Sequence, residues 1–204
     1  MPNPSYPSLL LLLAAVAAAS PVLAAPPQLH GPSKAAPGIA PNDGRHDFDF
    51  FFGHWNVHNR RLAGSTEWIE FEATSDCHPN LGGLANEDEF RTDFWEGFCG
   101  MSFRFFDPSQ KTWSIYWADN RTGALQPPVV GSFQGDQGVF EGPDTFAGKP
   151  ILVRYSWSRV TTPTPRWEQA FSSDGGKTWE TNWIMDFTRD GVDSKPAAAG
   201  GSEP

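Results

Sequence analysis

The aromatic side chains of this chain are confined to one stretch and follow a regular alternation. All nine Trp and all sixteen Phe residues lie between Phe48 and Phe187. Many occur in short runs in which apolar and polar residues take turns, as in WSIYW at 113–117 and WETNW at 179–183. A period of two residues is typical of β-strands that have one buried and one exposed face. The pattern therefore predicts an all-β, antiparallel domain with an aromatic interior.

Turn-forming pairs such as Asp107-Pro108 and Asp136 after Gly135 divide this stretch into about ten expected strands. A short helical turn is expected before them, where the apolar run at 48–52 ends at Gly53. Ten strands with short connections favour an up-and-down β-barrel, which leaves no exposed sheet edge, and a two-sheet sandwich is the alternative. The strands are expected at 55–62, 67–76, 85–94, 100–106, 112–119, 128–134, 138–144, 149–159, 166–171 and 178–189.

The regions outside the aromatic stretch differ from it in composition. Residues 1–24 have the features of a signal peptide, with an apolar run from Leu9 to Ala19 and small residues before Ala25. Residues 25–46 are rich in Pro and Ala and predict a flexible linker, and 191–204 predict a disordered tail. The barrel is therefore expected at 47–190, in a periplasmic or secreted protein that has no membrane anchor once the signal is removed.

Charge and motifs exclude several classes of function. The net charge of −9 argues against nucleic acid, which needs a basic surface to neutralise its phosphates. The chain has no G-x-S-x-G motif and no Gly-rich loop that opens a helix. The five His residues do not have a spacing that would let them share one ion on the expected strands. The sequence accordingly predicts no metal and no cofactor, and it gives no indication of oligomeric state.

The chain has two cysteines, Cys77 and Cys99, both inside the expected barrel. In an oxidising compartment two thiols in one small domain commonly pair, whereas the C-x-x-C spacing of a redox or metal site is missing. We therefore expect a Cys77–Cys99 disulfide, which would stabilise the fold by about 3 kcal/mol on the chain-entropy account.

The sequence Gly53-His54-Trp55, placed after a helical turn at the start of a strand meander, resembles the G-x-W opening of lipocalin-type (calycin) barrels. In those barrels the Trp packs across the closed end and a basic residue from the last strand covers it, so the resemblance assigns these structural roles to Trp55 and Arg189. With DFFFGHW at 49–55, LGG at 81–83, FDP at 106–108 and WSIYW at 113–117, the stretch from 47 to 190 also resembles a bacterial lipocalin-like domain family of unknown function. The resemblance implies a fold and no established activity.

A barrel of this size can hold a small ligand in its lumen. We expect an apolar or aromatic ligand there, lined by the side chains that share strand parity with apolar neighbours and by two polar groups: Trp113, Trp117, Trp157, Trp183, Arg104 and Glu168. One alternative is an enzyme of isomerase, cyclase or hydrolase type that uses Glu168 or Asp186 as acid–base, with Arg104 or Arg154 holding an anionic group. Another alternative is a structural or protein-interaction module whose aromatic residues fill the lumen completely.

Overall fold

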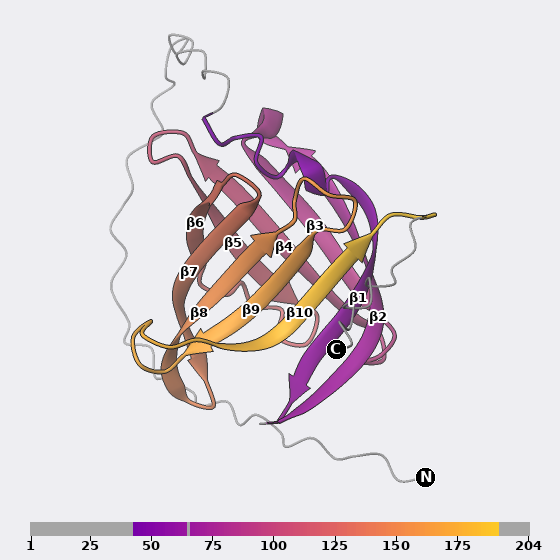
Figure 1. Ribbon diagram of the computed structural model, residues 1–204, viewed down its shortest axis with the longest axis vertical. Helices are drawn as coiled ribbons and strands as arrows, with labels where there is room; N and C mark the ends of the chain where they lie inside the picture. Colours follow the sequence, from indigo (N-terminus) through magenta and orange to yellow (C-terminus); the bar gives the residue numbers. More distant parts are fainter. Residues whose placement is uncertain (1–42, 65, 192–204) are drawn as a thin grey trace, which may run out of the picture. The chain divides into compact units, whose positions relative to one another are not determined.

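Each strand of the chain pairs antiparallel with the next one, and the last strand pairs with the first, so the sheet closes into a ten-stranded barrel (Figure 1). The computed structural model describes residues 43–64 and 66–191. The expected signal peptide at 1–24, residues 25–42 of the linker expected at 25–46, and residues 192–204 of the expected tail lie outside the described residues. The elements are the 3-10 turns η1 (Asp49–Phe51) and η2 (Leu81–Gly83) and the strands β1 (Gly53–Ala63), β2 (Glu67–Asn80), β3 (Ala85–Thr92), β4 (Phe98–Asp107), β5 (Thr112–Asp119), β6 (Val129–Gln134), β7 (Gln137–Phe146), β8 (Lys149–Ser158), β9 (Arg166–Ser172) and β10 (Glu180–Thr188).

The closed barrel confirms the all-β fold class and excludes the two-sheet sandwich. Its strands follow the expected alternation. On β1, for example, Trp55, Val57 and Asn59 are buried, while the residues between them are more exposed. Closure satisfies the backbone hydrogen bonds of every strand without leaving an edge. Within residues 43–64 and 66–191 there is no helix long and apolar enough to cross a membrane.

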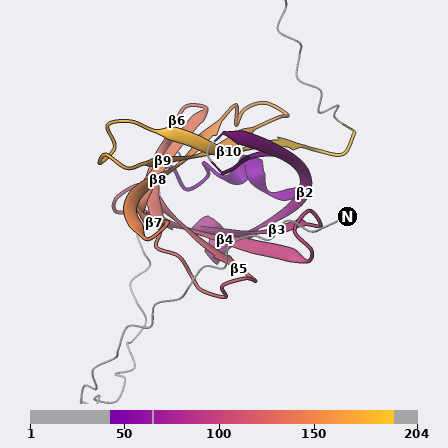
Figure 2. The same ribbon diagram turned by 90° about the horizontal axis from the view of Figure 1, so that it is seen from below.

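The N-terminal turn η1 fills one end of the barrel, and in Figure 2 it lies inside the ring of strands. Phe48 and Phe51 are almost completely buried there. The Phe51 ring packs 4.9 Å from Trp157 and 5.2 Å from Phe187, measured between ring centroids. The barrel domain begins before residue 47, where the sequence places its start after the linker. The evidence is the indole N–H of Trp113, which donates a hydrogen bond to the carbonyl of Gly44 at 2.9 Å. Aromatic contacts thus close one end of the lumen.

Arg189 covers the same end from outside. Its guanidinium lies 3.5 Å from the centroid of the Trp55 ring, a contact of the kind that the resemblance to lipocalin-type barrels implies. It also donates hydrogen bonds to the backbone carbonyls of His54 and Phe52, both at 2.6 Å. Trp55 in turn donates its indole N–H to the carbonyl of Phe51 at 2.7 Å. Arg189 therefore connects the end of β10 to η1 and to the start of β1.

Arg189→Ala should lower the free energy of unfolding by about 2 kcal/mol, because it removes a cation–π contact and charged hydrogen bonds to carbonyls. Urea unfolding followed by tryptophan fluorescence measures this change. Arg91→Ala is the matched control, since Arg91 forms an exposed ion pair with Glu89 and should shift the midpoint very little. Equal midpoints for Arg189→Ala and the unmodified protein would contradict the role of Arg189.

The expected Cys77–Cys99 disulfide is wrong, because both cysteines are free thiols. Cys77 lies on β2 and Cys99 on β4, so β3 separates them. Two strand spacings amount to about 10 Å, whereas the Cα atoms of a disulfide lie within about 7 Å. The side chains also face opposite ways: Cys77 is buried inside the barrel, and Cys99 is on the outer face, where its thiol donates to Glu89 at 3.0 Å.

Iodoacetamide should therefore modify Cys99 in the folded, unreduced protein and spare Cys77, and unfolding should make both available. Burial raises the pKa of Cys77 to about 12. Burial and the hydrogen bond to Glu89 also raise the pKa of Cys99. Because the thiolate is the reactive form, labelling of Cys99 should accelerate as the pH rises above 8. Mass spectrometry counts the modified thiols, and unreactive cysteines in unfolded, unreduced protein would contradict the free thiols.

Candidate functional site

Between the closed end and the opposite rim, the barrel encloses a cavity of about 780 Å³. Pockets that bind small molecules span roughly 300–1,000 Å³, so this volume is sufficient for one ligand. Gly64, Phe146 and Glu180 contribute to its lining and are exposed, so the cavity reaches the surface at the rim opposite η1. Much of the wall is aromatic and includes Trp117, Tyr155, Trp157, Trp167, Trp183 and Phe187.

Neighbouring strands β8, β9 and β10 supply a continuous aromatic wall. Trp157 on β8 lies opposite Trp167 on β9 in the strand register. The Trp167 ring packs 4.9 Å from Tyr155 and 5.8 Å from Trp183, measured between centroids. The Trp167–Trp183 pair is edge-to-face and the Trp167–Tyr155 pair is tilted. Aromatic pairs of this kind restrict the rings and add about 0.5–1.5 kcal/mol per pair beyond their burial. The wall is therefore rigid and preformed.

Trp117 completes the wall on the opposite side because β4 carries a glycine beneath it. A Cβ atom at Gly100 would lie 2.2 Å from atoms of the Trp117 ring, which no side chain could tolerate without moving the indole. The indole N–H of Trp117 donates to Asp119 at 3.3 Å. Gly100 and Asp119 together fix Trp117 against the cavity.

Deeper in the barrel, Arg104 and Asp88 form an ion pair whose side chains are only 5% and 7% exposed. Arg104 donates to Asp88 at 2.5 Å and to the side-chain oxygen of Asn86 at 3.0 Å. Ser75 donates to the second oxygen of Asp88 at 3.0 Å. The guanidinium also lies 5.0 Å from the ring centroid of Phe48. Arg104 is thus neutralised and held by the protein itself, next to η1.

The structure brings four of the six residues expected at the ligand site to the cavity: Trp117, Trp157, Trp183 and Arg104. Trp113 does not line it. Trp113 faces inward, but it lies at the height of η1, where its ring packs 5.0 Å from Phe48 and 5.3 Å from Phe106. Glu168 does not line it either, because it lies between the inward-facing Trp167 and Gln169 and so faces outward.

Asp186, the other acid considered for catalysis, also lies outside the cavity, between the lining residues Met185 and Phe187. It forms ion pairs with Arg166, at 2.7 Å, and with Arg159. Burial acts to raise the pKa of Asp186, but the hydrogen bonds and charges of the two arginines outweigh it and lower the pKa. Arg154 is likewise engaged on the outside, with Glu141 at 2.6 Å. These groups are not placed to act on a molecule in the lumen.

Sequence reasoning missed several lining residues, chiefly Trp167, Asp88 and Arg61. The parity signal was present for all three: Trp167 has the parity of Phe171, and Asp88 has the parity of Phe90, both of which face inward. Arg61 shares its parity with Trp55 and Val57 on β1. In the part of the chain that the structure describes, no three His, Cys, Asp or Glu side chains are grouped so that they could hold a metal.

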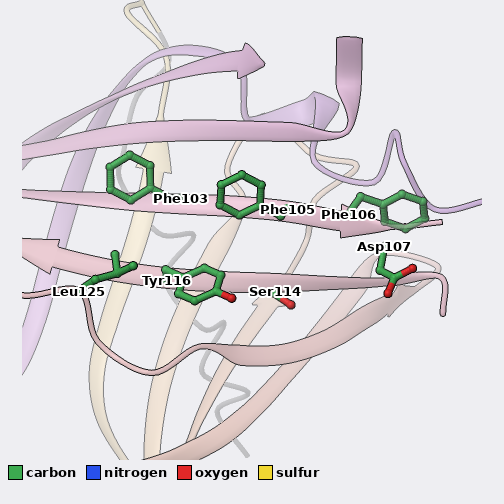
Figure 3. Close-up of a pocket in the computed structure, with 7 residues that line it drawn as sticks. All are labelled: Phe103, Phe105, Phe106, Asp107, Ser114, Tyr116 and Leu125. Atoms are coloured by element: carbon green, nitrogen blue, oxygen red, sulfur yellow. The ribbon is translucent and has the colours of Figure 1, made fainter. Parts of the chain in front are cut away.

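A second hollow, of about 600 Å³, lies on the outer face of β4 and β5. Figure 3 shows Phe103 and Phe105 along β4, with Tyr116 on β5 and Leu125 in the following loop beside them. The rings of Phe105 and Tyr116 lie 6.0 Å apart. Phe105 and Leu125 are exposed, so this hollow is a surface groove, whereas the lumen is walled on all sides by strands and opens only at one rim. The lumen is the stronger candidate.

Asp88→Asn should lower the free energy of unfolding by about 3–5 kcal/mol, because it leaves the buried charge of Arg104 without its counter-charge. The double variant Asp88→Leu with Arg104→Met should recover most of this loss, since apolar residues of similar volume replace the whole pair. Glu87→Gln, one residue away on the outer face, is the matched control. Urea unfolding tests all three, and a stable Asp88→Asn protein would contradict the account of this pair.

None of the known protein families matches the sequence, and no curated protein matches it. Among solved structures, the chain is similar to the crystal structure of Rv2717c from M. tuberculosis. The similarity covers 74% of this chain and 98% of that one, at 12% sequence identity and a TM-score of 0.50. At this identity the likeness supports the barrel fold and carries no information about a ligand.

Proposed function

We propose that the protein binds one small apolar or aromatic molecule in the lumen of the barrel. The observation that carries the proposal is the 780 Å³ cavity, closed at one end by η1, open at the other and walled by aromatic rings. The resemblance of the G-x-W segment to lipocalin-type barrels supports the same proposal, and with it membership of the bacterial lipocalin-like family. Export to the periplasm or the medium is part of this proposal and rests on residues 1–24 alone.

The physical reason for binding is the poor hydration of the aromatic part of the cavity wall. At about 30 Å³ per molecule, the cavity has room for roughly two dozen waters. Water against an aromatic wall finds few hydrogen-bond partners there, so an apolar ligand that displaces it gains free energy. The wall is already rigid, which limits the entropy lost on binding. Size, apolarity and preorganisation therefore all favour a ligand.

The two alternatives have less support. A cavity of this volume argues against a module whose lumen is filled by its own side chains. The enzyme alternative relied on Glu168 and Asp186, and both lie on the outer face of the barrel. Of the carboxylates that line the cavity, Asp88 is paired with Arg104, Asp119 and Asp144 accept backbone hydrogen bonds, and Glu180 is exposed at the rim. Binding without chemical conversion is the function that this arrangement favours.

A titration with the neutral dye N-phenyl-1-naphthylamine tests the proposal, because the dye fluoresces in apolar surroundings and quenches tryptophan by energy transfer. The dye should bind at one site, and Trp167→Ala or Trp183→Ala should weaken binding about tenfold, since each removes a ring from the wall. Trp68→Ala is the matched control, because Trp68 is 43% exposed and not part of the lining. Absence of saturable binding, or equal weakening by Trp68→Ala, would contradict the proposal.

A further inference from the structure

Arg61 is a cationic side chain that faces the cavity near its open end. It lies on β1, two residues beyond the buried Asn59, and so has the parity of the inward-facing residues. In the strand register it is opposite Trp183 on β10 and Ile69 on β2. Because β1 runs from Gly53 at the closed end to Ala63 at the rim, Arg61 lies nearer the open end of the barrel than the ion pair of Arg104 does.

Two indole rings flank the guanidinium of Arg61. Its Cζ atom lies 4.3 Å from the ring centroid of Trp183 and 5.1 Å from that of Trp95. Trp95 belongs to the loop between β3 and β4 and packs against Phe71 and Phe98. A guanidinium that lies over aromatic rings keeps its N–H groups directed outward in its own plane. The two indoles therefore fix the position of the charge without using its hydrogen-bond donors.

These donors are not used by another protein group within residues 43–64 and 66–191. No carboxylate lies within 4.0 Å of Arg61, and no acceptor forms a hydrogen bond with it, in that part of the chain. Burial lowers the pKa of Arg61, with no contribution from a neighbouring acid. A half-buried cation that lacks a counter-ion is unfavourable in a protein interior, and an anion at this place would compensate it.

The acidic side chains that line the cavity do not form an ion pair with Arg61. Asp88 is paired with Arg104. Asp119 accepts hydrogen bonds from the backbone N–H groups of the following turn, and Asp144 accepts one from the backbone N–H of Thr145. Glu180 is exposed at the rim. Arg61 is thus the lining cation, within the described residues, that the protein leaves available to a ligand.

We propose that Arg61 binds the oxyanion of an amphipathic ligand, a carboxylate or a similar group, while the apolar body of that ligand extends toward Trp157. This inference rests on the proposed function and deepens it, because it names the ligand class as a monoanionic apolar or aromatic acid. The planar fork of a guanidinium matches the two oxygens of a carboxylate, which favours a bidentate contact. The aromatic floor at Phe51 and Trp157 lies at the other end of the cavity and suits an apolar tail.

A pair of dyes with the same aromatic body tests this inference. N-phenyl-1-naphthylamine is neutral, and 8-anilinonaphthalene-1-sulfonate differs from it by one sulfonate. The unmodified protein should bind the anionic dye at least tenfold more tightly than the neutral one. Arg61→Gln and Arg61→Met should each remove this preference, which is measured as the ratio of the two dye affinities in the same variant, and urea unfolding followed by tryptophan fluorescence shows that the variants are folded.

Arg60→Gln is the matched control, because it makes the same charge change one residue away on the outer face of β1 and should preserve the preference. Failure of the neutral dye to bind would overturn the proposed function itself. Saturable binding of the neutral dye without a preference for the anionic one, or a preference that survives in both Arg61 variants, would leave the proposed function standing and overturn the role of Arg61.

Discussion

The packing of Phe48 and Phe51 inside one end of the barrel is the contact on which the rest of the structure depends. Ten strands enclose more space than their own inward side chains fill at that end, and η1 supplies the missing volume. Arg189 holds η1 from outside through Trp55 and backbone carbonyls, and Arg104 contacts its rings from inside. Because η1 closes only one end, the remaining lumen stays hollow and opens at the opposite rim.

Charge inside this aromatic barrel is distributed in two different ways. Arg104 lies deep, next to η1, where Asp88 neutralises its charge and Asp88 and Asn86 accept hydrogen bonds from its two terminal nitrogens. Its role is structural, because removing a partner would leave a buried charge. Arg61 lies near the rim between two indoles, and no described carboxylate neutralises it. The contrast gives the lumen a direction: a floor that combines aromatic rings with a neutralised ion pair, an aromatic wall, and a cation without a described counter-ion near the entrance.

Period-two alternation was sufficient to predict the all-β fold and the inward direction of Trp117, Trp157 and Trp183, because alternation determines which face of a sheet a residue occupies. The number of strands and their short connections favoured the barrel over the sandwich. It does not determine how far along the barrel axis the residue lies. Trp113 faces inward as expected, yet it contacts Phe48 at the closed end instead of lining the cavity. That position depends on where η1 sits, which no local pattern encodes.

The disulfide and the position of Glu168 also differ from expectation, because both depend on how the strands are arranged in the barrel. The expected disulfide relied on the number of cysteines and the expected compartment, whereas pairing also requires strand adjacency and a shared face, which depend on the register of β2, β3 and β4. Glu168 was assigned to the lumen although its neighbour Trp167 has the inward parity, and the strand can bury only one of the two. Arg61 could not be recognised as a ligand contact from sequence. Its proposed role depends on the lack of a carboxylate or hydrogen-bond acceptor beside it among the described residues, and only the folded structure shows this.

The central claim, that the lumen is a hollow binding site, is tested most directly by NMR spectroscopy of the nine tryptophan indole N–H groups during a titration with N-phenyl-1-naphthylamine. The account predicts that the resonances of the lining residues Trp117, Trp157, Trp167 and Trp183 shift together and saturate. Those of Trp55 and Trp113 at the closed end, and of Trp68 and Trp179 outside the cavity, should change little. Shifts confined to Trp68 or Trp179, or no saturable shift at all, would contradict the account.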